Sequence, residues 1–439
     1  MTTQPPATQS PTMQPPPAPS PAAPSPAAPS RFAGAVPFSG PRFHVEPAAL
    51  YREMRHEHGA VAPIVLDGDV PAWLVLGYRE LLHVTSDPVL FSRDSELWNQ
   101  WDRIPDDWPL LPMIGRKQPS ILYTVGDRHR RRAAMMSNAM EAVDPFELRR
   151  CAERYADELI DGFCGRGEAD LIAEFATLLP VRVLARIYGF SEEQGPKLVT
   201  AIDDLVNSTE NAIAGQVFVF TSMTALIAAK SHRPGPDVVS RMLADRHDFT
   251  DEEIVQDVMV MTVAGHQPTA DWMGNSLRLM LTDDRFSASF SGGRHSVGEA
   301  MNEVLWEDTP SQNIAGRWAS REAQLGGRHI HTGDLLVLGF AAANADPRVH
   351  IEGGGPTRGN NSFFSFGHGE HRCPFSAQEI AEVIARTGIE VLLDRLPDID
   401  LTVAPGSLVR RSSPWLRGMT ELPVSFTPAP ALAALGDNR

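Results

Sequence analysis

A cysteine and two histidines lie close together in the stretch FFSFGHGEHRCPFSAQ, residues 363–378. The cysteine, Cys373, is one of three in the chain, with Cys151 and Cys164. Its simplest role would be that of a small buried hydrophobe. Together with His368 and His371 it could also belong to a metal site, because thiolate and imidazole are both metal ligands.

Two metal sites fit these residue types to different degrees. A structural zinc site needs four ligands with paired spacings, and no second cluster in the sequence supplies the fourth. A thiolate ligand for haem iron needs a single cysteine on a turn at the start of a helix. Free backbone N–H groups and the helix dipole should lower the thiol pKa there. The pattern after Pro374 indicates such a helix, so the residues leave the buried hydrophobe and the iron thiolate open and make zinc the least favoured interpretation.

The spacing around the cysteine resembles the haem-binding loop of the cytochrome P450 family, Phe-Gly-x-Gly-x-His-x-Cys. The matching residues are Phe366, Gly367, Gly369, His371 and Cys373. The resemblance, which extends over about residues 45–430, implies haem b (iron-protoporphyrin IX) as the cofactor. It implies Cys373 as the axial iron ligand, Phe366 and Gly367 beside the sulfur, and His371 near a haem propionate.

Other segments match the family in the same order. The segment AGHQPTADW is similar to the oxygen-activating stretch of the family's long central helix. The resemblance places Ala264 against the haem and Gly265, Gln267 and Thr269 on the oxygen side.

The resemblance also implies partners for the haem propionates. His129 and Arg317 match a histidine and an arginine with that role. The second arginine, expected four residues after His129, is Ala133, and Arg132 is a candidate substitute. Buried carboxylates need such cationic or donor partners.

The chain departs from the family at a structural ion pair. The usual Glu-x-x-Arg motif is here Glu303 followed by Trp306 at the arginine position. A buried carboxylate without its arginine must find another donor or become neutral. We expect a rearranged network to which Trp306 contributes its indole N–H.

The oxygen side and the loop depart as well. Gln267 and Pro268 replace the usual acid and alcohol, and glutamine cannot relay a proton as a carboxylate does. The Thr269 hydroxyl either turns inward or bonds back to its own helix. Phe375 replaces a common glycine and is expected to shift the following helix, and Gln378 stands where an apolar residue is usual.

Helical patterns predict the elements that position these residues. They dominate from Asp127 to about Leu281, with a break at 231–237. Thr250 and Glu253 indicate a capping box that starts a long core helix through Pro268, and a further helix is predicted over 297–307. A hairpin is predicted from a strand beginning near Val61 and a strand over 72–76, and a strand pair near 328–338. The predicted fold is mainly α with small β-sheets, the cytochrome P450 fold in a single large domain.

Composition sets the organisation and excludes several classes. The first thirty residues are nearly all Pro, Ala, Ser, Thr and Gln, which predicts a disordered tail over 1–38 and a haem domain over 39–439. A net charge of −16 argues against a nucleic-acid-binding face. Three cysteines, no signal-peptide pattern and no apolar run of about 18 residues predict a cytoplasmic protein without a membrane anchor.

The resemblance implies a monooxygenase that inserts one oxygen atom of O₂ into a small apolar substrate. Electrons would come from NAD(P)H through a ferredoxin and a ferredoxin reductase, and Arg128, Arg130, Arg131 and Arg132 with Arg372 would form the docking patch. An ordinary solvated helix face explains these arginines equally well. Residues 94–118, with Trp98, Trp101 and Trp108, are either a lid over the substrate or a local core.

Two alternatives stay open. The missing acid–alcohol pair favours an enzyme that uses peroxide or that couples or rearranges its substrate. Trp306, Pro268 and the proline-rich tail would also fit a haem protein with impaired catalysis that works inside a protein complex, with the tail as docking segment.

Overall fold

A computed structural model describes residues 31–114, 119–191, 194–206, 211–287, 295–349 and 360–432. The predicted tail up to residue 30 lies outside the described residues. Residues 31–38, which the sequence assigns to that tail, are part of the fold: β1 (Val36–Pro37) pairs with β2, and Phe38 is buried. The folded part therefore begins before residue 39.

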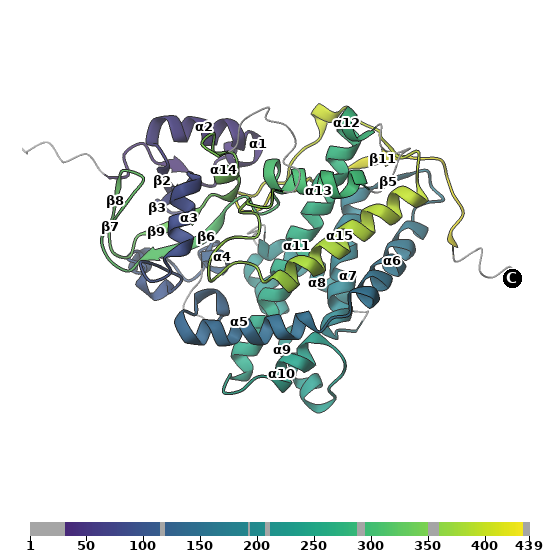
Figure 1. Cartoon of the computed structure of the whole chain (residues 1–439), viewed down its shortest axis with the longest axis horizontal. Coiled ribbons are helices and arrows are strands. Elements are labelled where there is room, and N and C mark those ends of the chain that lie inside the picture. Colours follow the sequence, from purple (N-terminus) through teal and green to yellow (C-terminus); the bar gives the residue numbers. More distant parts are fainter. Residues whose placement is uncertain are drawn as a thin grey trace, which may run out of the picture.

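Helices make up most of the described chain, which confirms the predicted fold class (Figure 1). The α-helices are α1 (Arg42–Val45), α2 (Pro47–His58), α3 (Tyr78–Ser86), α4 (Leu111–Ile114), α5 (Gly126–Glu141), α6 (Pro145–Asp161), α7 (Leu178–Tyr188), α8 (Gly195–Val206), α9 (Ala212–His232), α10 (Val238–Ala244), α11 (Asp251–Thr282), α12 (Asp284–Ser287), α13 (His295–Glu307), α14 (Phe340–Asn344) and α15 (Phe375–Arg395). Shorter turns of helix are η1 (Ser95–Leu97), η2 (Trp101–Arg103), η3 (Ile121–Tyr123), the π-helical η4 (Ile172–Ala176) and η6 (Pro405–Ser407).

The strands form three sheets. They are β1, β2 (Val61–Leu66), β3 (Val70–Val75), β4 (Phe91–Ser92), β5 (Glu168–Asp170), β6 (Ile314–Ala319), β7 (Ala323–Leu325), β8 (Arg328–Ile330), β9 (Leu335–Leu338), β10 (Asp400–Leu401) and β11 (Pro423–Ser425). A mixed six-stranded sheet has the order β1-β2-β3-β9-β6-β4, a second sheet the order β10-β11-β5, and β7 pairs with β8 alone. The six-stranded sheet lies to one side of the helical part (Figure 1).

The predicted hairpin is confirmed, because β2 and β3 pair antiparallel from Val61↔Val75 to Leu66↔Val70. The predicted strand pair near 328–338 is wrong in its pairing. The two strands exist, but β8 pairs with β7, and β9 lies between β3 and β6. Apolar patterning located both strands, whereas partner choice depends on segments distant in sequence.

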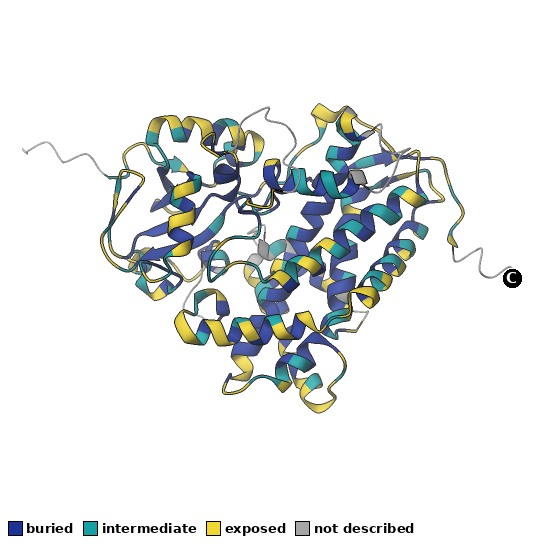
Figure 2. Ribbon diagram, in the orientation of Figure 1, coloured by how far each residue is buried: buried dark blue, intermediate teal, exposed yellow. Residues whose placement is uncertain are grey.

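The long helix α11 crosses the middle of the helical part, as predicted. Its capping box forms: Thr250 Oγ1 accepts the Glu253 N–H at 3.2 Å, and the Glu253 carboxylate accepts the Thr250 N–H at 3.0 Å. The helix continues through Pro268 and packs against α7, α9, α13 and α15. Most of its residues are buried, as are the inner faces of the helices around it (Figure 2). It is therefore a rigid wall for anything bound beside it.

One helix in the described part of the chain, α9, is long and apolar enough in composition to cross a membrane. It packs against α8, α10 and α11, which makes it a layer of the folded domain. Ile213, Val217 and Phe218 on its outer face are exposed.

Candidate functional site

The loop before α15 holds Cys373 in a fixed turn. The Cys373 N–H donates to the Phe366 carbonyl at 2.9 Å, which closes the loop. Gly367 and Gly369 have φ of 72° and 76°, a region that glycine adopts without strain. A Cβ on Gly369 would lie 2.1 Å from the carbonyl oxygen of Thr85, so only glycine fits against α3. Two glycines of the motif therefore serve the loop geometry that presents the cysteine.

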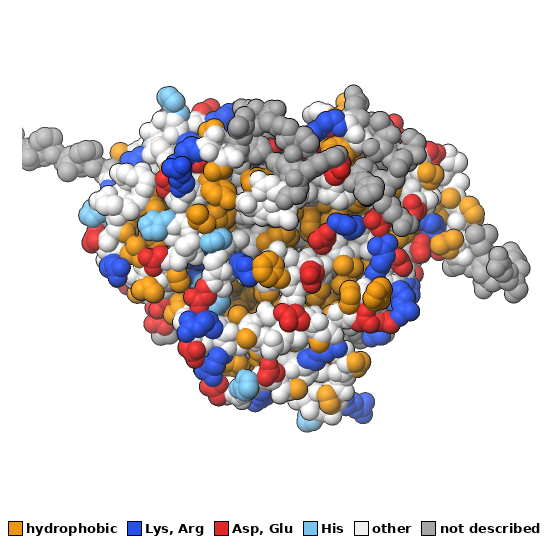
Figure 3. All heavy atoms as spheres, in the orientation of Figure 1, with side chains coloured by type: hydrophobic (Ala, Val, Ile, Leu, Met, Phe, Trp, Pro, Cys, Tyr) orange, Lys and Arg blue, Asp and Glu red, His pale blue; other side chains and the backbone are white. Residues whose placement is uncertain are grey.

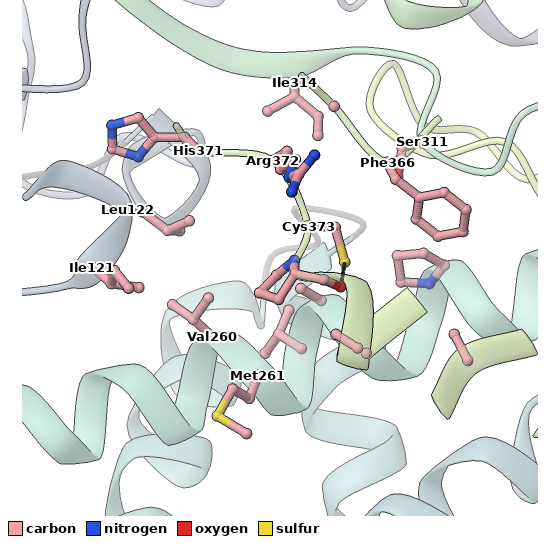
Figure 4. Close-up of a pocket in the computed structure, with 18 of the residues that line it drawn as sticks. Ile121, Leu122, Val260, Met261, Ser311, Ile314, Phe366, His371, Arg372 and Cys373 are labelled. Carbon is pink, nitrogen blue, oxygen red and sulfur yellow. Dashed lines mark hydrogen bonds between the residues drawn. The ribbon is translucent and has the colours of Figure 1, made fainter. Parts of the chain in front are cut away.

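Cys373 lines a cavity of about 430 Å³ between α11 and the start of α15. Val260, Ala264 and Thr269 come from α11, and Phe366 and Ala377 come from the cysteine side. Figure 4 shows the Cys373 thiol, the Phe366 ring and Ile314 around one space, with Val260 approaching from α11. The size lies within the usual range for small-molecule and cofactor sites, and the walls are mostly apolar.

Burial sets the protonation of the thiol. It raises the pKa of Cys373 to about 12, so the lowering expected from the helix start does not prevail. The cysteine lies two residues before the first residue of α15, and the apolar cavity wall outweighs the helix dipole. A bound metal ion would have to deprotonate the thiol, as coordinating metals do.

Four donor side chains from different elements gather in one part of the cavity wall: Arg93, His129, Arg317 and His371. The imidazole rings of His129 and His371 lie with their centroids 3.8 Å apart. Each of the four has one buried nitrogen for which no described residue is a hydrogen-bond partner: Arg93 Nε, His129 Nδ1, Arg317 Nε and His371 Nε2. Buried donors are normally paired, so this cluster indicates a site for an anion.

The pKa values in this cluster show a shortage of negative charge. Burial, reinforced by Arg93, holds the pKa of Arg317 well below its usual value. Burial also lowers the pKa of His129 to about 4 and that of His371 further. Glu370 is the one carboxylate among the described lining residues. The buried Arg317 thus has Arg93 and one carboxylate, Glu370, as charged neighbours, and a bound dianion would relieve the repulsion between the two arginines.

The structure places His129, Arg317 and His371 together, and adds Arg93, which the sequence did not reveal. Arg93 follows the two-residue strand β4, and its Nη1 donates to the carbonyls of Ala315 and Gly316 at 2.8 and 3.0 Å. These carbonyls flank the bulge in β6. Nothing in the local pattern SRD distinguishes this arginine from a surface one.

Arg132 does not take the place of the absent arginine in this cavity. Its guanidinium binds Asp257 on α11 through Nε at 2.9 Å and through Nη2, and it is fully buried there. It lies outside the lining. Asp257 needs this charge, because burial raises the pKa of its carboxyl to about 6 even with Arg132 beside it. Arg132 therefore joins α5 to α11.

Comparison with known proteins shows which family the chain resembles. No family model matches the chain. The chain is 28% identical over 390 residues to cytochrome P450 107B1 of Saccharopolyspora erythraea, covering 85% of this chain and 93% of that protein. It is 27% identical over 409 residues to vitamin D(3) 25-hydroxylase of Pseudonocardia autotrophica, with coverages of 90% and 97%. The structure of CYP154C4 from Streptomyces sp. W2061 has the same fold, with a TM-score of 0.79 at 24% identity over 89% of this chain and 97% of that one. The chain belongs to the cytochrome P450 family.

In this cytochrome P450, Trp306 connects α13 to the loop that leads to the cysteine. Its indole N–H donates to the Asn360 carbonyl at 2.9 Å, and its ring contacts Phe363 edge-on at 5.8 Å between centroids. Glu303 is instead partly exposed and pairs with Arg285 at 2.6 Å. Trp306 thus makes the contact with the loop before Cys373, and Glu303 is paired with an arginine at the surface.

This arrangement predicts unequal effects for two substitutions. Trp306→Phe should lower the free energy of unfolding by about 1–3 kcal/mol, because it loses a hydrogen bond and leaves a void. Glu303→Gln should cost less than about 1 kcal/mol, since its partner is largely exposed. Denaturant unfolding of the two variants checks this, and a larger loss in Glu303→Gln would make the carboxylate the main anchor.

The residues that were expected on the oxygen side of the haem separate into two groups. Ala264, Gly265, Pro268 and Thr269 line the cavity. Gln267 does not: it is buried, and its amide donates to Asp271 at 3.1 Å. The Thr269 hydroxyl donates to the Gly265 carbonyl at 2.6 Å, which is the second of the two expectations for this residue.

The structure also shows where Phe375, Gln378 and the residues of the possible zinc site lie. Phe375 is 62% exposed with the Arg372 guanidinium over its ring at 3.9 Å, so it does not separate α15 from the cavity as expected. The Gln378 amide donates to the Cys373 carbonyl at 2.7 Å. Within the described residues, His368, His371 and Cys373 do not form a group with metal-ligand geometry, so the zinc interpretation is wrong.

The tryptophans of residues 94–118 form a local core. Trp98 contacts Trp101 at 4.9 Å and Trp108 at 5.9 Å between ring centroids, and none of the three lines the cavity. Among the described residues of this segment, Met113 reaches the cavity wall.

The arginines of α5 are mostly paired. Arg128 binds Glu253 at 2.6 Å, Arg131 binds Asp248 at 2.8 Å, and Arg130 lies 3.5 Å from both Asp127 and Glu370. Figure 3 shows basic and acidic side chains interspersed on the visible face. The positive field expected at a ferredoxin-docking patch is therefore weakened by these carboxylates.

Proposed function

We propose that this cytochrome P450 binds haem b in the cavity, with Cys373 as the iron ligand. The observation that carries the proposal is the cluster of buried nitrogens without a hydrogen bond on Arg93, His129, Arg317 and His371, because buried donors need acceptors and a haem brings two carboxylates. The apolar walls contributed by Ala264, Phe366 and their neighbours suit a planar apolar ring system. The thiol, the donor cluster and the apolar walls thus fit the three chemically different parts of a haem.

When bound, the haem supplies an iron centre at which dioxygen is activated for transfer of one oxygen atom to the substrate. The chain contributes an apolar space on the α11 side, where Val260, Val263 and Ala264 exclude water. Met113, Met136, Met140 and Met259 extend this lining with flexible apolar side chains. These walls support a small apolar substrate, held by shape more than by charge.

Electrons would reach the site from NAD(P)H through a ferredoxin and a ferredoxin reductase, in the cytoplasm. The exposed Arg372 lies next to Cys373 in sequence and so marks the face on which an electron donor would come closest to the thiolate. Arg130, whose carboxylate neighbours are 3.5 Å away, extends this face. The paired Arg128 and Arg131 contribute less.

Absorption spectroscopy of the purified protein tests the proposal. The reduced protein under carbon monoxide should show a strongly red-shifted Soret band, which reports a thiolate ligand. NAD(P)H, a ferredoxin and its reductase with labelled dioxygen should then place one labelled atom in the product of an apolar substrate. Protein that takes up no haem, or a Soret band typical of a histidine or neutral-thiol ligand, would overturn the assignment.

A second candidate is a peroxide-dependent enzyme, and the oxygen-side contacts favour it. Gln267 is turned to Asp271, and the Thr269 hydroxyl is held by Gly265. Asp271 is itself paired with Arg411 at 2.6 Å and lies outside the cavity lining. Among the described residues, no acid or unpaired hydroxyl on the α11 wall is positioned to deliver protons to bound dioxygen. Turnover that requires the ferredoxin system and does not proceed with hydrogen peroxide would exclude this candidate.

Thr269→Val tests whether the hydroxyl relays protons. Because that hydroxyl is occupied by the Gly265 carbonyl, ferredoxin-supported product formation should stay within about threefold of wild type, whereas a lost proton relay costs about 10²-fold or more. Thr262→Val is the matched control, since its hydroxyl bonds the Val258 carbonyl at 2.8 Å on the same helix. A 10²-fold loss confined to Thr269→Val would assign the relay to Thr269.

A further inference from the structure

The β7–β8 hairpin carries two histidines and a glutamate on one face. In its register Gln324 lies opposite His329, and the next positions outward are Glu322 and His331. Side chains of a strand alternate between faces, so Glu322, Gln324, His329 and His331 share one face. Gly326 and Gly327, with φ of 55° and 79°, make the tight turn between the strands. The hairpin lies at the outer end of the β-rich side, away from α11 and α15 (Figure 1).

The potential ligand atoms of three of these residues lie close together. His329 Nε2 is 2.8 Å from Glu322 Oε2, and the rings of His329 and His331 are 4.9 Å apart between centroids. One ligand atom from each of Glu322, His329 and His331 lies within 4.8 Å of the others. Within the described chain, this is the one group of three such residues with this spacing. Because metal–ligand bonds are about 2.0–2.2 Å long, small side-chain rotations bring all three atoms onto one ion.

The backbone under this face is well anchored. Leu325 and Ile330, on the opposite face, are buried in a cluster with Val61 and Trp73. The Arg328 guanidinium donates to the carbonyls of His58 and Val61 at 2.9 and 3.3 Å. The ligand-bearing face is thus held by the core, while Glu322 and His329 themselves are exposed. A site on a rigid element with free outer side chains can close around an ion at low cost.

We propose that Glu322, His329 and His331 bind a divalent transition-metal ion of the zinc, nickel or copper type. Two imidazoles select these ions over magnesium and calcium, which prefer all-oxygen ligand sets. Three protein ligands leave further coordination positions open to water. None of the three residues lines the cavity beside Cys373, so the site is separate from the proposed haem and does not depend on it.

Calorimetric titration of the tag-free full-length protein with Zn²⁺ tests the site. We expect one ion per chain and a rise in the thermal midpoint with zinc, because a ligand of the native state stabilises it. With Cu²⁺ in place of zinc, the electron paramagnetic resonance spectrum should show hyperfine coupling to two imidazole nitrogens. Wild-type protein without a zinc-binding step would overturn the proposal.

Two ligand variants and one control locate the ion. His329→Ala and Glu322→Gln should each weaken zinc binding at least about tenfold, since loss of an outer-shell partner alone costs about 10–100-fold. His247→Asn is the control, because His247 pairs with Asp245 at 3.1 Å but belongs to no group of three potential ligands among the described residues, and asparagine tolerates its φ of 48°. This variant should bind zinc as wild type does. Unchanged affinity and stoichiometry in a His329→Ala/His331→Ala double variant would contradict the proposal.

A gain-of-ligand variant keeps the test independent of stability losses. Gln324 is exposed and lies opposite His329 on the same face. Gln324→His would add a fourth ligand and should tighten zinc binding about tenfold or more. An affinity equal to that of wild type would place the ion elsewhere.

Discussion

Cys373→Ser is expected to remove the red-shifted Soret band of the reduced carbonyl complex and to abolish oxygen transfer. The serine hydroxyl is close in size, so the loop should keep its hydrogen bond from residue 373 to the Phe366 carbonyl. Serine does not, however, replace the thiolate that a haem-thiolate centre requires. Product formation should fall below detection, while the cavity and the donor cluster remain. The measurement is the carbonyl spectrum together with turnover in the ferredoxin system.

Cys151→Ser is the matched control for this substitution. Cys151 is a half-buried cysteine on α6 that does not line the cavity. Its variant should keep the carbonyl spectrum and the activity of wild type. Retention of the red-shifted band in Cys373→Ser, or its loss in Cys151→Ser, would assign the ligand to a different cysteine.

Much of the fold could be predicted from local sequence. The capping box at Thr250 and Glu253 predicted the start of α11, and short runs of apolar residues predicted β2 and β3. The pairing of strands was predicted wrongly for β8 and β9. Strands that pair across long stretches of sequence share no local sequence pattern that would identify them as partners. The anchoring of residues 31–38 was missed for the same reason: Arg31 pairs with Asp334, about three hundred residues away.

The site residues, too, were predictable where a local motif contains them and were missed where tertiary packing decides. The spacing of the motif identified Cys373, His371 and Phe366, and the order of the family-like segments identified His129 and Arg317. All five residues line the cavity. Arg93 was missed because its role comes from the third dimension, where a short edge strand carries it beside Arg317. Arg132 was misjudged because a candidate one residue away in sequence points to a different neighbour, Asp257. The spacing of residues in the sequence therefore predicts which of them form a motif. Which charged side chains line the same cavity depends on tertiary packing.

Arg317→Met is expected to act in opposite directions on the haem-free and the haem-bound protein. In the haem-free protein it removes a buried charge that lies beside Arg93, so the free energy of unfolding should rise by about 1 kcal/mol or more. Toward haem it removes a charged donor for a carboxylate, which is worth about 1.5–3 kcal/mol, so haem affinity should fall about 10–100-fold. Arg317 suits this test because its side chain makes one hydrogen bond within the described residues, from Nη1 to the Gly316 carbonyl, and this bond is long at 3.4 Å. Denaturant unfolding of haem-free protein and haem titration measure the two effects separately.

Arg132→Met is the matched control, because Arg132 is a buried arginine outside the cavity lining. Arg132 neutralises the buried Asp257, and its loss leaves that carboxylate unpaired, which should cost about 3–5 kcal/mol of stability. The two variants therefore differ in the sign of their effect on the haem-free protein, although both replace a buried arginine with methionine. An Arg317→Met protein that is less stable without haem and unchanged in haem affinity would make Arg317 a packing residue. The buried nitrogens without a hydrogen bond in the cavity wall argue for the other outcome. Arg317 is buried beside the like charge of Arg93, and this cost is expected where a bound anion offsets it.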